Sequence, residues 1–276
     1  MQLNQMKHMK TIHINPQSKG SLGKSFETEC RTAWLDAIGI PWYGYDLDER
    51  HKTFQMRHPK NVQFIDIADK RPAESREQVS AMIQDALNRP EPVVFIDCKA
   101  QSDDLVMTSF DSLSLFGYAR EADAEFVLSL FPSDDNASMI NLGAIVQWGH
   151  QGGARFVIVY NPTQSSGELF DKSTMKQSLL SVGAKEIHVP ALMPATIREL
   201  EKREKEKGRG ISFGELASGI KGVPKTLLTS DMICLLRKMS KQYASIADVL
   251  LPASELCNVP EPKAATEFRK TLNVSL

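Results

Sequence analysis

The sequence predicts an α/β protein with a doubly wound, mostly parallel sheet and helices on both faces, followed by a helical C-terminal portion. Short apolar runs alternate with segments of helical periodicity between Thr11 and Val189. One of these runs, Val93 to Ile96, is apolar throughout and ends at Asp97, which is typical of a central parallel strand buried on both faces. In such sheets, ligands bind at the carboxyl edge of the strands.

The first expected unit is a strand, a glycine-bearing loop, a helix and a second strand. Thr11 to Asn15 is the first strand, and from Ser25 onward apolar residues recur at the spacing of one helix face. Trp42 to Asp46 is short and aromatic, as expected for the second strand. It delivers Asp46 and Asp48 into the loop that follows.

The remaining elements continue the alternation. Further strands are expected at Val62 to Ile67, Val93 to Asp97, Glu125 to Phe131, Arg155 to Asn161 and Lys185 to Val189. Helices are expected from Ala73 to Leu87 and near Asp103 to Gly117, Ala137 to Gly149 and Lys172 to Val182. We therefore divide the chain into a flexible N-terminal segment (1–9), a nucleotide-binding core (10–194), a helical portion packed on the core (195–251) and an irregular tail (252–276).

Composition narrows the class of protein. The chain has 276 residues, 42% of them hydrophobic and 24% charged, which suffices for one large α/β domain. Its formal net charge is -1, so any contact with nucleic acid has to be local. No apolar run approaches the roughly 18 to 20 residues of a membrane span, and residues 1–10 lack the apolar stretch of a secretion signal. Four scattered cysteines fit a reducing compartment, and we expect a cytoplasmic protein.

The run Lys19-Gly20-Ser21-Leu22-Gly23-Lys24-Ser25 has the composition of a phosphate-binding loop. Its glycines let backbone N–H groups converge on an anion in front of a helix N-terminus, and Lys24 is placed to meet the terminal phosphates. Ser25 would direct a hydroxyl to Mg²⁺. The general pattern G-x-x-x-x-G-K-[ST] is not met, because no glycine stands five residues before Gly23.

The loop resembles instead K-G-G-x-G-K-[ST], the deviant Walker A loop of the ParA/MinD family of ATPases, with Ser21 in place of the middle glycine. The resemblance implies a P-loop ATPase that binds ATP and Mg²⁺. It also implies an ATP-dependent homodimer, in which Lys19 reaches the partner's nucleotide and takes part in catalysis. The nucleotide-binding residues that it implies in this loop are Gly20, Ser21, Leu22, Gly23, Lys24 and Ser25.

Two further elements follow in the order of that family. The second strand ends in Asp46-Leu47-Asp48, an Asp-x-Asp motif, and Asp97 stands where the Walker B strand ends. The resemblance implies that Ser25, Asp46 and Asp97 serve the metal and that Asp48 positions or deprotonates the attacking water. It also implies that Asn161 and Pro162 contact the adenine. The segment Cys98-Lys99-Ala100 departs from relatives, which more often carry Pro or Gly there, and this departure predicts slow hydrolysis.

Within the family, the chain resembles TraL proteins of conjugative plasmids. The likeness covers the Walker A loop, the acidic loop leading to Thr53-Phe54, the stretch from Val157 to Pro162, and the stretch from His188 to Leu192. It implies a role in plasmid conjugation, mobilisation or partition. A plasmid or transfer-apparatus protein would then be a further partner, and local contact with DNA is compatible with it.

Three functions remain open at the level of sequence. The first is an ATP-dependent dimeric switch. The second is an ATP-using ligase or kinase that acts on a small acid with the same core. The third is a nucleotide-binding adaptor without hydrolysis, which the departures at Ser21 and Lys99 permit. A zinc site and a serine hydrolase lack support, because no paired histidine spacing and no G-x-S-x-G turn occur.

Overall fold

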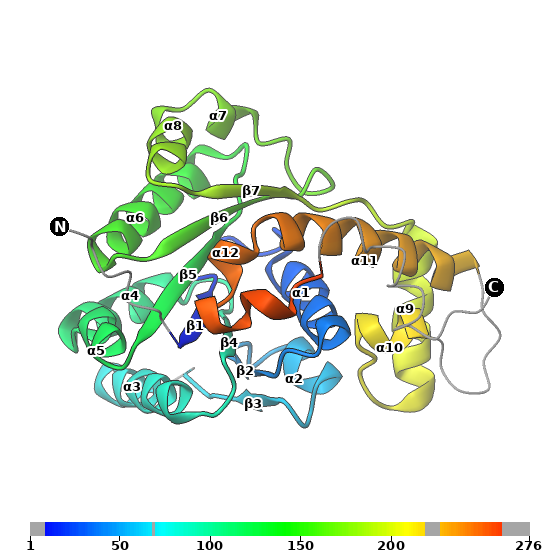
Figure 1. Ribbon diagram of the computed structural model, residues 1–276, viewed down its shortest axis with the longest axis horizontal. Coiled ribbons are helices and arrows are strands. Elements are labelled where there is room, and N and C mark those ends of the chain that lie inside the picture. The colour runs from blue at the N-terminus through cyan, green and yellow to red at the C-terminus, as the bar shows by residue number, and fades with distance from the viewer. Residues whose placement is uncertain (1–8, 68–69, 219–226, 261–276) are drawn as a thin grey trace.

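A single sheet of seven parallel strands organises the protein (Figure 1). The computed structural model describes residues 9–67, 70–218 and 227–260. The strand order is β3-β2-β4-β1-β5-β6-β7, and each neighbouring pair runs parallel. The strands are β1 (Lys10–Ile14), β2 (Trp42–Asp46), β3 (Val62–Phe64), β4 (Val93–Asp97), β5 (Ala124–Leu130), β6 (Arg155–Tyr160) and β7 (Lys185–His188).

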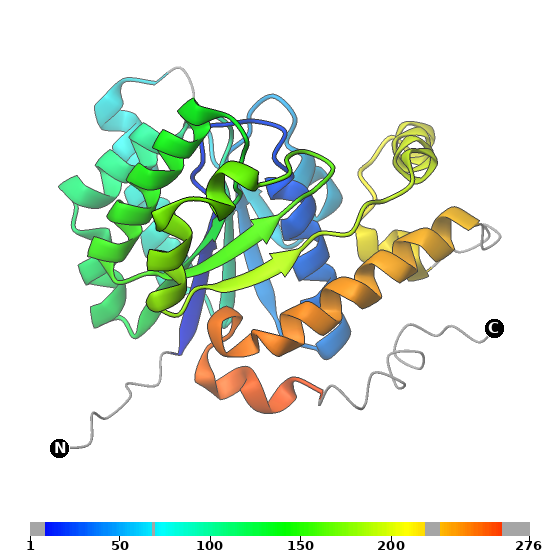
Figure 2. The same cartoon turned by 90° about the horizontal axis from the view of Figure 1, so that it is seen from above.

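Helices cover both faces of this sheet, and the two views in Figures 1 and 2 agree on which helices lie on which side. One face carries α3 (Pro72–Asn88), α4 (Asp103–Ser112), α5 (Leu115–Glu121), α6 (Asn136–Gly152), α7 (Glu168–Asp171) and α8 (Thr174–Ser181). The other carries α1 (Lys24–Ile38), α2 (Thr53–Arg57), α9 (Pro194–Lys207), α10 (Phe213–Ser218), α11 (Leu227–Ser245) and α12 (Ala247–Leu250). The predicted doubly wound α/β fold is confirmed, and the sheet is parallel throughout.

Local differences from the expected elements have local causes. One helix was expected near Asp103 to Gly117, but the chain forms α4 and α5, because Ser114 between them adopts a left-handed φ of 51°. The helix expected near Lys172 to Val182 is α8, and the short α7 just before it was not predicted. The helix α2 was not predicted at all, and it is held by Phe54, which is 1% exposed and stacks on Trp42 at 5.9 Å. A 3-10 helix spans Ala253–Asn258 in the tail expected to be irregular.

The helices from Pro194 onward pack on the core, α10 through Phe213 on Phe26 and α11 along α1. The rings of Trp34 in α1 and Tyr243 in α11 lie 5.4 Å apart, inside one buried apolar cluster. Met1 to His8, where the flexible segment was expected, lie outside the described residues. None of the helices formed by the described residues is both long and apolar enough to cross a bilayer.

A buried polar network joins β1, α1 and α11 beneath this packing. The Arg31 guanidinium donates to Glu27 Oε1 through Nε at 2.9 Å and through Nη2 at 2.5 Å, and the Tyr243 hydroxyl donates to the same oxygen at 2.9 Å. Because His13 Nε2 faces the carbonyl of Leu250 at 2.9 Å, this nitrogen carries the proton. Nδ1 of His13 then accepts from Arg31 Nη1 at 2.7 Å. Burial, followed by the nearby Arg31 charge, lowers the pKa of His13 well below its usual value, so the imidazole is neutral.

We expect the hydrogen bond of Tyr243 to contribute measurably to the stability of the folded protein. Tyr243→Phe keeps the ring but removes the donor to Glu27, which leaves a buried carboxylate with one bond fewer. We expect a loss of about 1 to 3 kcal/mol in the free energy of unfolding, measured by urea denaturation. The matched control Tyr118→Phe, at a residue 46% exposed, should change it by less than about 0.5 kcal/mol. Equal effects of the two substitutions would contradict a structural role for this hydroxyl.

Candidate functional site

Residues 15–23 join β1 to α1 and are called the β1–α1 loop. The backbone of this loop curves around the ammonium of Lys24, and this arrangement is called the cradle. Gly23 caps α1 with a left-handed φ of 93°, and a Cβ at this position would stand 2.3 Å from Asn161 Nδ2. Only glycine fits there. Ser21 also adopts a left-handed φ, 57°, at the place where the K-G-G-x-G-K-[ST] pattern has glycine. The loop thus keeps the glycine-type conformation although the side chain has changed.

The side chain of Lys24 is folded into this cradle. Its ammonium donates to the carbonyl oxygens of Gln17 and Lys19, at 2.9 Å each, and the residue is only 7% exposed. Burial lowers the pKa of Lys24, and the negative charge of Asp97 acts against that shift. Lys24 is the first residue of α1, and the N-terminus of a helix favours bound anions. The ammonium adds a positive charge at this place.

The cradle is anchored to the ends of two neighbouring strands. The buried amide of Gln17 donates to the carbonyl of Phe131 at 2.9 Å and accepts from the Phe131 N–H at 2.5 Å, as a backbone pair would. Asn161 Nδ2 donates to the carbonyl of Leu22 at 3.1 Å. The structure therefore brings Asn161 to the β1–α1 loop, and its predicted contact with the adenine stays a prediction. Gln17 carried no signal in the sequence beyond its place after a strand.

Asp97 and Ser25, both predicted for the metal, lie together. Asn15 Nδ2 donates to Asp97 Oδ1 at 3.1 Å, and the Ser25 hydroxyl bonds to the same carboxyl group. Burial, followed by repulsion from Asp46, raises the pKa of Asp97 to about 7, while the Ser25 and Asn15 bonds and the Lys24 charge oppose the shift. A buried carboxyl beside a hydroxyl fits a hard divalent cation, whose charge would favour the ionised form.

A cation at this place would need ligands from outside the chain. Among the residues that the structure describes, no group of three His, Cys, Asp or Glu side chains is arranged to hold a metal ion. Mg²⁺ in phosphate-transfer sites is held by one or two protein oxygens together with substrate phosphates. The donor pair of Ser25 and Asp97 fits that arrangement.

Asp46, also predicted for the metal, shapes the acidic loop, residues 47–52. Its Oδ1 accepts the backbone N–H of Asp48 at 2.9 Å, and its Oδ2 accepts that of Gln55 at 3.0 Å. The side chain is fully buried, and burial raises its pKa although these N–H groups oppose the shift. Asp46 thus caps the turn into α2, and its role in holding a metal stays a prediction.

Asp48, the predicted catalytic carboxylate, lies half-buried in that loop. Its Oδ1 accepts the N–H groups of Arg50 at 2.9 Å and His51 at 3.2 Å, and its Oδ2 lies 3.2 Å from the His51 ring nitrogen Nδ1. Burial acts to raise the pKa of Asp48, but the donors from Arg50 and His51 outweigh it and hold the pKa below its usual value. An ionised carboxylate of this kind suits orienting a water molecule better than taking its proton.

Lys19 points away from the site of Lys24. Its Nζ donates to Ser133 Oγ at 2.8 Å and lies 3.8 Å from the Asp135 carboxylate, at the start of α6. The side chain is 40% exposed. The two lysines of the loop are therefore separate in space, one enclosed and one at the surface.

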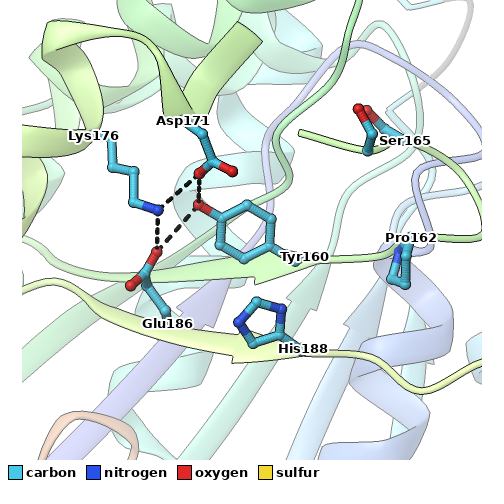
Figure 3. A pocket seen from close by; sticks show the side chains of 8 residues that line it. Tyr160, Pro162, Ser165, Asp171, Lys176, Glu186 and His188 are labelled. Atoms are coloured by element: carbon cyan, nitrogen blue, oxygen red, sulfur yellow. Dashed lines mark hydrogen bonds and ion pairs between the residues drawn. The ribbon is translucent and has the colours of Figure 1, made fainter. Parts of the chain in front are cut away.

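A pocket of about 230 Å³ opens beyond the ends of β6 and β7, with Pro162 on its wall (Figure 3). Lys176 bridges Asp171 and Glu186 at 2.7 and 3.0 Å, and the rings of Tyr160 and His188 stack at 4.8 Å. Apart from Pro162, these residues were not predicted for a site. Their charges come from α7, α8 and β7, three elements that follow one another in the chain.

Comparisons with known proteins give structural neighbours only. No protein-family model matches the chain, and a search of curated proteins finds no match. A proposed plasmid partition protein of Borrelia burgdorferi B31, solved with AMPPNP bound, is 10% identical, with a TM-score of 0.40, over 83% of this chain and 99% of its own. The MinD cell division protein of Aquifex aeolicus is 11% identical, with a TM-score of 0.36, over 97% of this chain and 98% of its own. The interpretation of the site rests on its own geometry.

The pKa of Asp97 predicts a dependence of stability on pH. In the folded protein the pKa is about 7, raised above the ordinary 3.8, so the folded state holds the proton more tightly. The contribution of Asp97 to the free energy of unfolding therefore falls as pH rises from about 4 to about 7. Asp97→Asn abolishes this loss, and we expect it to be more stable than wild type at pH 8 by about 1 to 4 kcal/mol.

Urea denaturation at pH 5 and pH 8 in EDTA tests this expectation. The gain from Asp97→Asn should shrink markedly at pH 5, where the wild-type carboxyl is protonated. Asp104→Asn, at an exposed position in the same region, should show no gain that depends on pH. A gain of the same size at both pH values would contradict the raised pKa.

Proposed function

We propose that the chain is a P-loop ATPase that works as an ATP-dependent dimeric switch. The observation that carries the proposal is the enclosed Lys24 ammonium at the N-terminus of α1, with Ser25 and Asp97 beside it. A lysine ammonium that donates to two backbone carbonyls can donate to phosphate oxygens instead. Its hydrogen bonds to phosphate are stronger, because both groups are charged. The N–H groups of residues 20–24 would hold the remaining phosphate oxygens.

The other site residues divide the remaining tasks. Ser25 and Asp97 would hold Mg²⁺, which neutralises phosphate charge when bound. Asp48 would orient the attacking water, and Asn161 with Pro162 would place the adenine next to the cradle. Phosphoryl transfer depends mostly on positioning and charge stabilisation, which such a set of residues can supply.

The proposed biological role is in plasmid conjugation, mobilisation or partition. It is supported by the resemblance of the loop to the deviant Walker A pattern and of the chain to TraL proteins. Partners would be a second copy of this chain, a plasmid or transfer-apparatus protein, and DNA through a local contact.

One observation favours an adaptor that binds nucleotide without hydrolysing it. The Asp48 carboxylate already accepts N–H groups from Arg50 and His51, and its pKa is lowered, so it is a weak base. In that case ATP would bind and promote dimerisation, but no phosphate would be released. A sensitive phosphate assay on the purified protein separates the two proposals.

Lys24→Ala should abolish nucleotide binding. The substitution removes an ammonium whose charge-assisted bonds contribute about 1.5 to 3 kcal/mol each. Isothermal titration with Mg²⁺ and ADP should therefore show a loss of affinity of at least about tenfold to a hundredfold. Lys172→Ala, at a side chain 74% exposed, is the matched control and should bind as wild type does. Unchanged affinity in a folded Lys24→Ala protein would refute the proposed phosphate site.

ATP with Mg²⁺, but not ADP, should convert the protein from monomer to dimer. Lys19→Ala should prevent a stable dimer while ADP binding to the monomer stays within about threefold, because Lys19 bonds outside the cradle of Lys24. Size-exclusion chromatography with light scattering and isothermal titration provide the two readouts. If Lys19→Ala loses ADP as severely as Lys24→Ala does, Lys19 belongs to the local cradle and has no role across a dimer.

A further inference from the structure

An ion pair connects two loops that leave the sheet side by side. The acidic loop follows β2, and residues 98–102, the β4 loop, follow β4. The strands are neighbours with Asp46 opposite Asp97, so both loops start at the same level of the carboxyl edge. Lys99 Nζ lies 3.0 Å from each carboxylate oxygen of Glu49. This pair is the side-chain link between the loop of Asp48 and the loop that follows Asp97.

The β4 loop is a fixed support for Lys99. The Cys98 N–H donates to Asn15 Oδ1 at 2.9 Å, and the Gln101 N–H donates to the Ser18 carbonyl at 3.0 Å. Ala100 Cβ stands 3.6 Å from the place that a Cβ on Gly20 would occupy. The backbone on both sides of Lys99 is thus attached to the β1–α1 loop.

The acidic loop is attached to the rest of the protein at its two ends, through Leu47 and through Lys52, whose ammonium lies 4.0 Å from the centre of the Phe64 ring. Its first residue, Leu47, is buried and donates to the Asp97 carbonyl at 3.0 Å, and Asp48 N–H bonds to the Asp46 carboxylate. Beyond that point Asp48 and Glu49 are half-buried and Arg50 is exposed. Lys99 therefore contacts the loop between its two ends, at the residue directly after Asp48.

We propose that Lys99 is a positioning residue, which holds Asp48 over the β1–α1 loop through its ion pair with Glu49. The inference rests on the proposed ATPase function and deepens it. The Lys99 and Glu49 side chains are 22% and 28% exposed, and pairs so close to solvent contribute little to stability. A small displacement of a group that positions the attacking water, however, can cost up to about a hundredfold in rate. The pair thus matters for the geometry of Asp48 rather than for folding.

The experiment measures single-turnover hydrolysis of ATP with Mg²⁺ for Lys99→Met, Glu49→Gln and the double variant. Each single substitution removes the pair while keeping the length of the side chain. We expect all three to hydrolyse ATP about fivefold to a hundredfold more slowly than wild type, with the double variant no slower than either single one. Lys99→Arg, which keeps the charge, should retain most of the rate. ADP affinity and the urea midpoint should stay at wild-type values.

The control is the exposed ion pair between Glu168 in α7 and Lys172, the residue that follows this helix. It is disrupted by Lys172→Met and Glu168→Gln, which should not change the rate. A wild-type rate for Glu49→Gln would overturn the positioning role, because Lys99 would then act without its partner or not at all. Weakened ADP binding in Lys99→Met would overturn it as well, since Lys99 would then be a phosphate ligand. Absence of hydrolysis in wild type would refute the ATPase proposal itself, and with it this inference.

Discussion

The buried charge of Lys24 is the constraint on which the rest of the site depends. Its ammonium is stabilised inside the protein by the carbonyls of Gln17 and Lys19, which accept its hydrogen bonds, and by nearby carboxylates. Asp97 supplies the strongest of these charges. The same burial that lowers the pKa of Lys24 raises that of Asp97, so each group is costly alone and favours the charged form of the other.

The parallel sheet explains why these groups meet. Carboxyl ends of parallel strands emerge at one edge, so Asp97 at the end of β4 and Asn161 after β6 both contact the β1–α1 loop, at Asn15 and at Leu22. Behind the loop, Glu27 in the first turns of α1 bonds to Tyr243 in α11. The helix that follows the loop is thus joined to the C-terminal helices through a buried contact.

The sequence predicted what depends on local patterns, and it missed what depends on tertiary contacts. Buried parallel strands read as apolar runs, so all seven strands were expected within a few residues of their observed bounds. The loop was recognisable because its glycines and lysines have fixed spacing. By contrast, α2 exists because Asp46 and Phe54 hold it, and the Gln17 amide finds its partner at Phe131, over a hundred positions away. Lys99 was noticed only as a departure, since its partner Glu49 lies on another loop.

The central claim is that the cradle around Lys24 is a phosphate site. The most direct test is hydrogen exchange measured with and without ATP and Mg²⁺. The account predicts slower exchange in residues 15–25, where N–H groups would bond to phosphate oxygens, together with slower exchange in the acidic loop and the β4 loop. The C-terminal residues of α3, which lie beside Lys10 at the start of β1, should exchange at the same rate in both samples. If nucleotide slowed exchange in other parts of the protein but not in residues 15–25, this result would contradict the account.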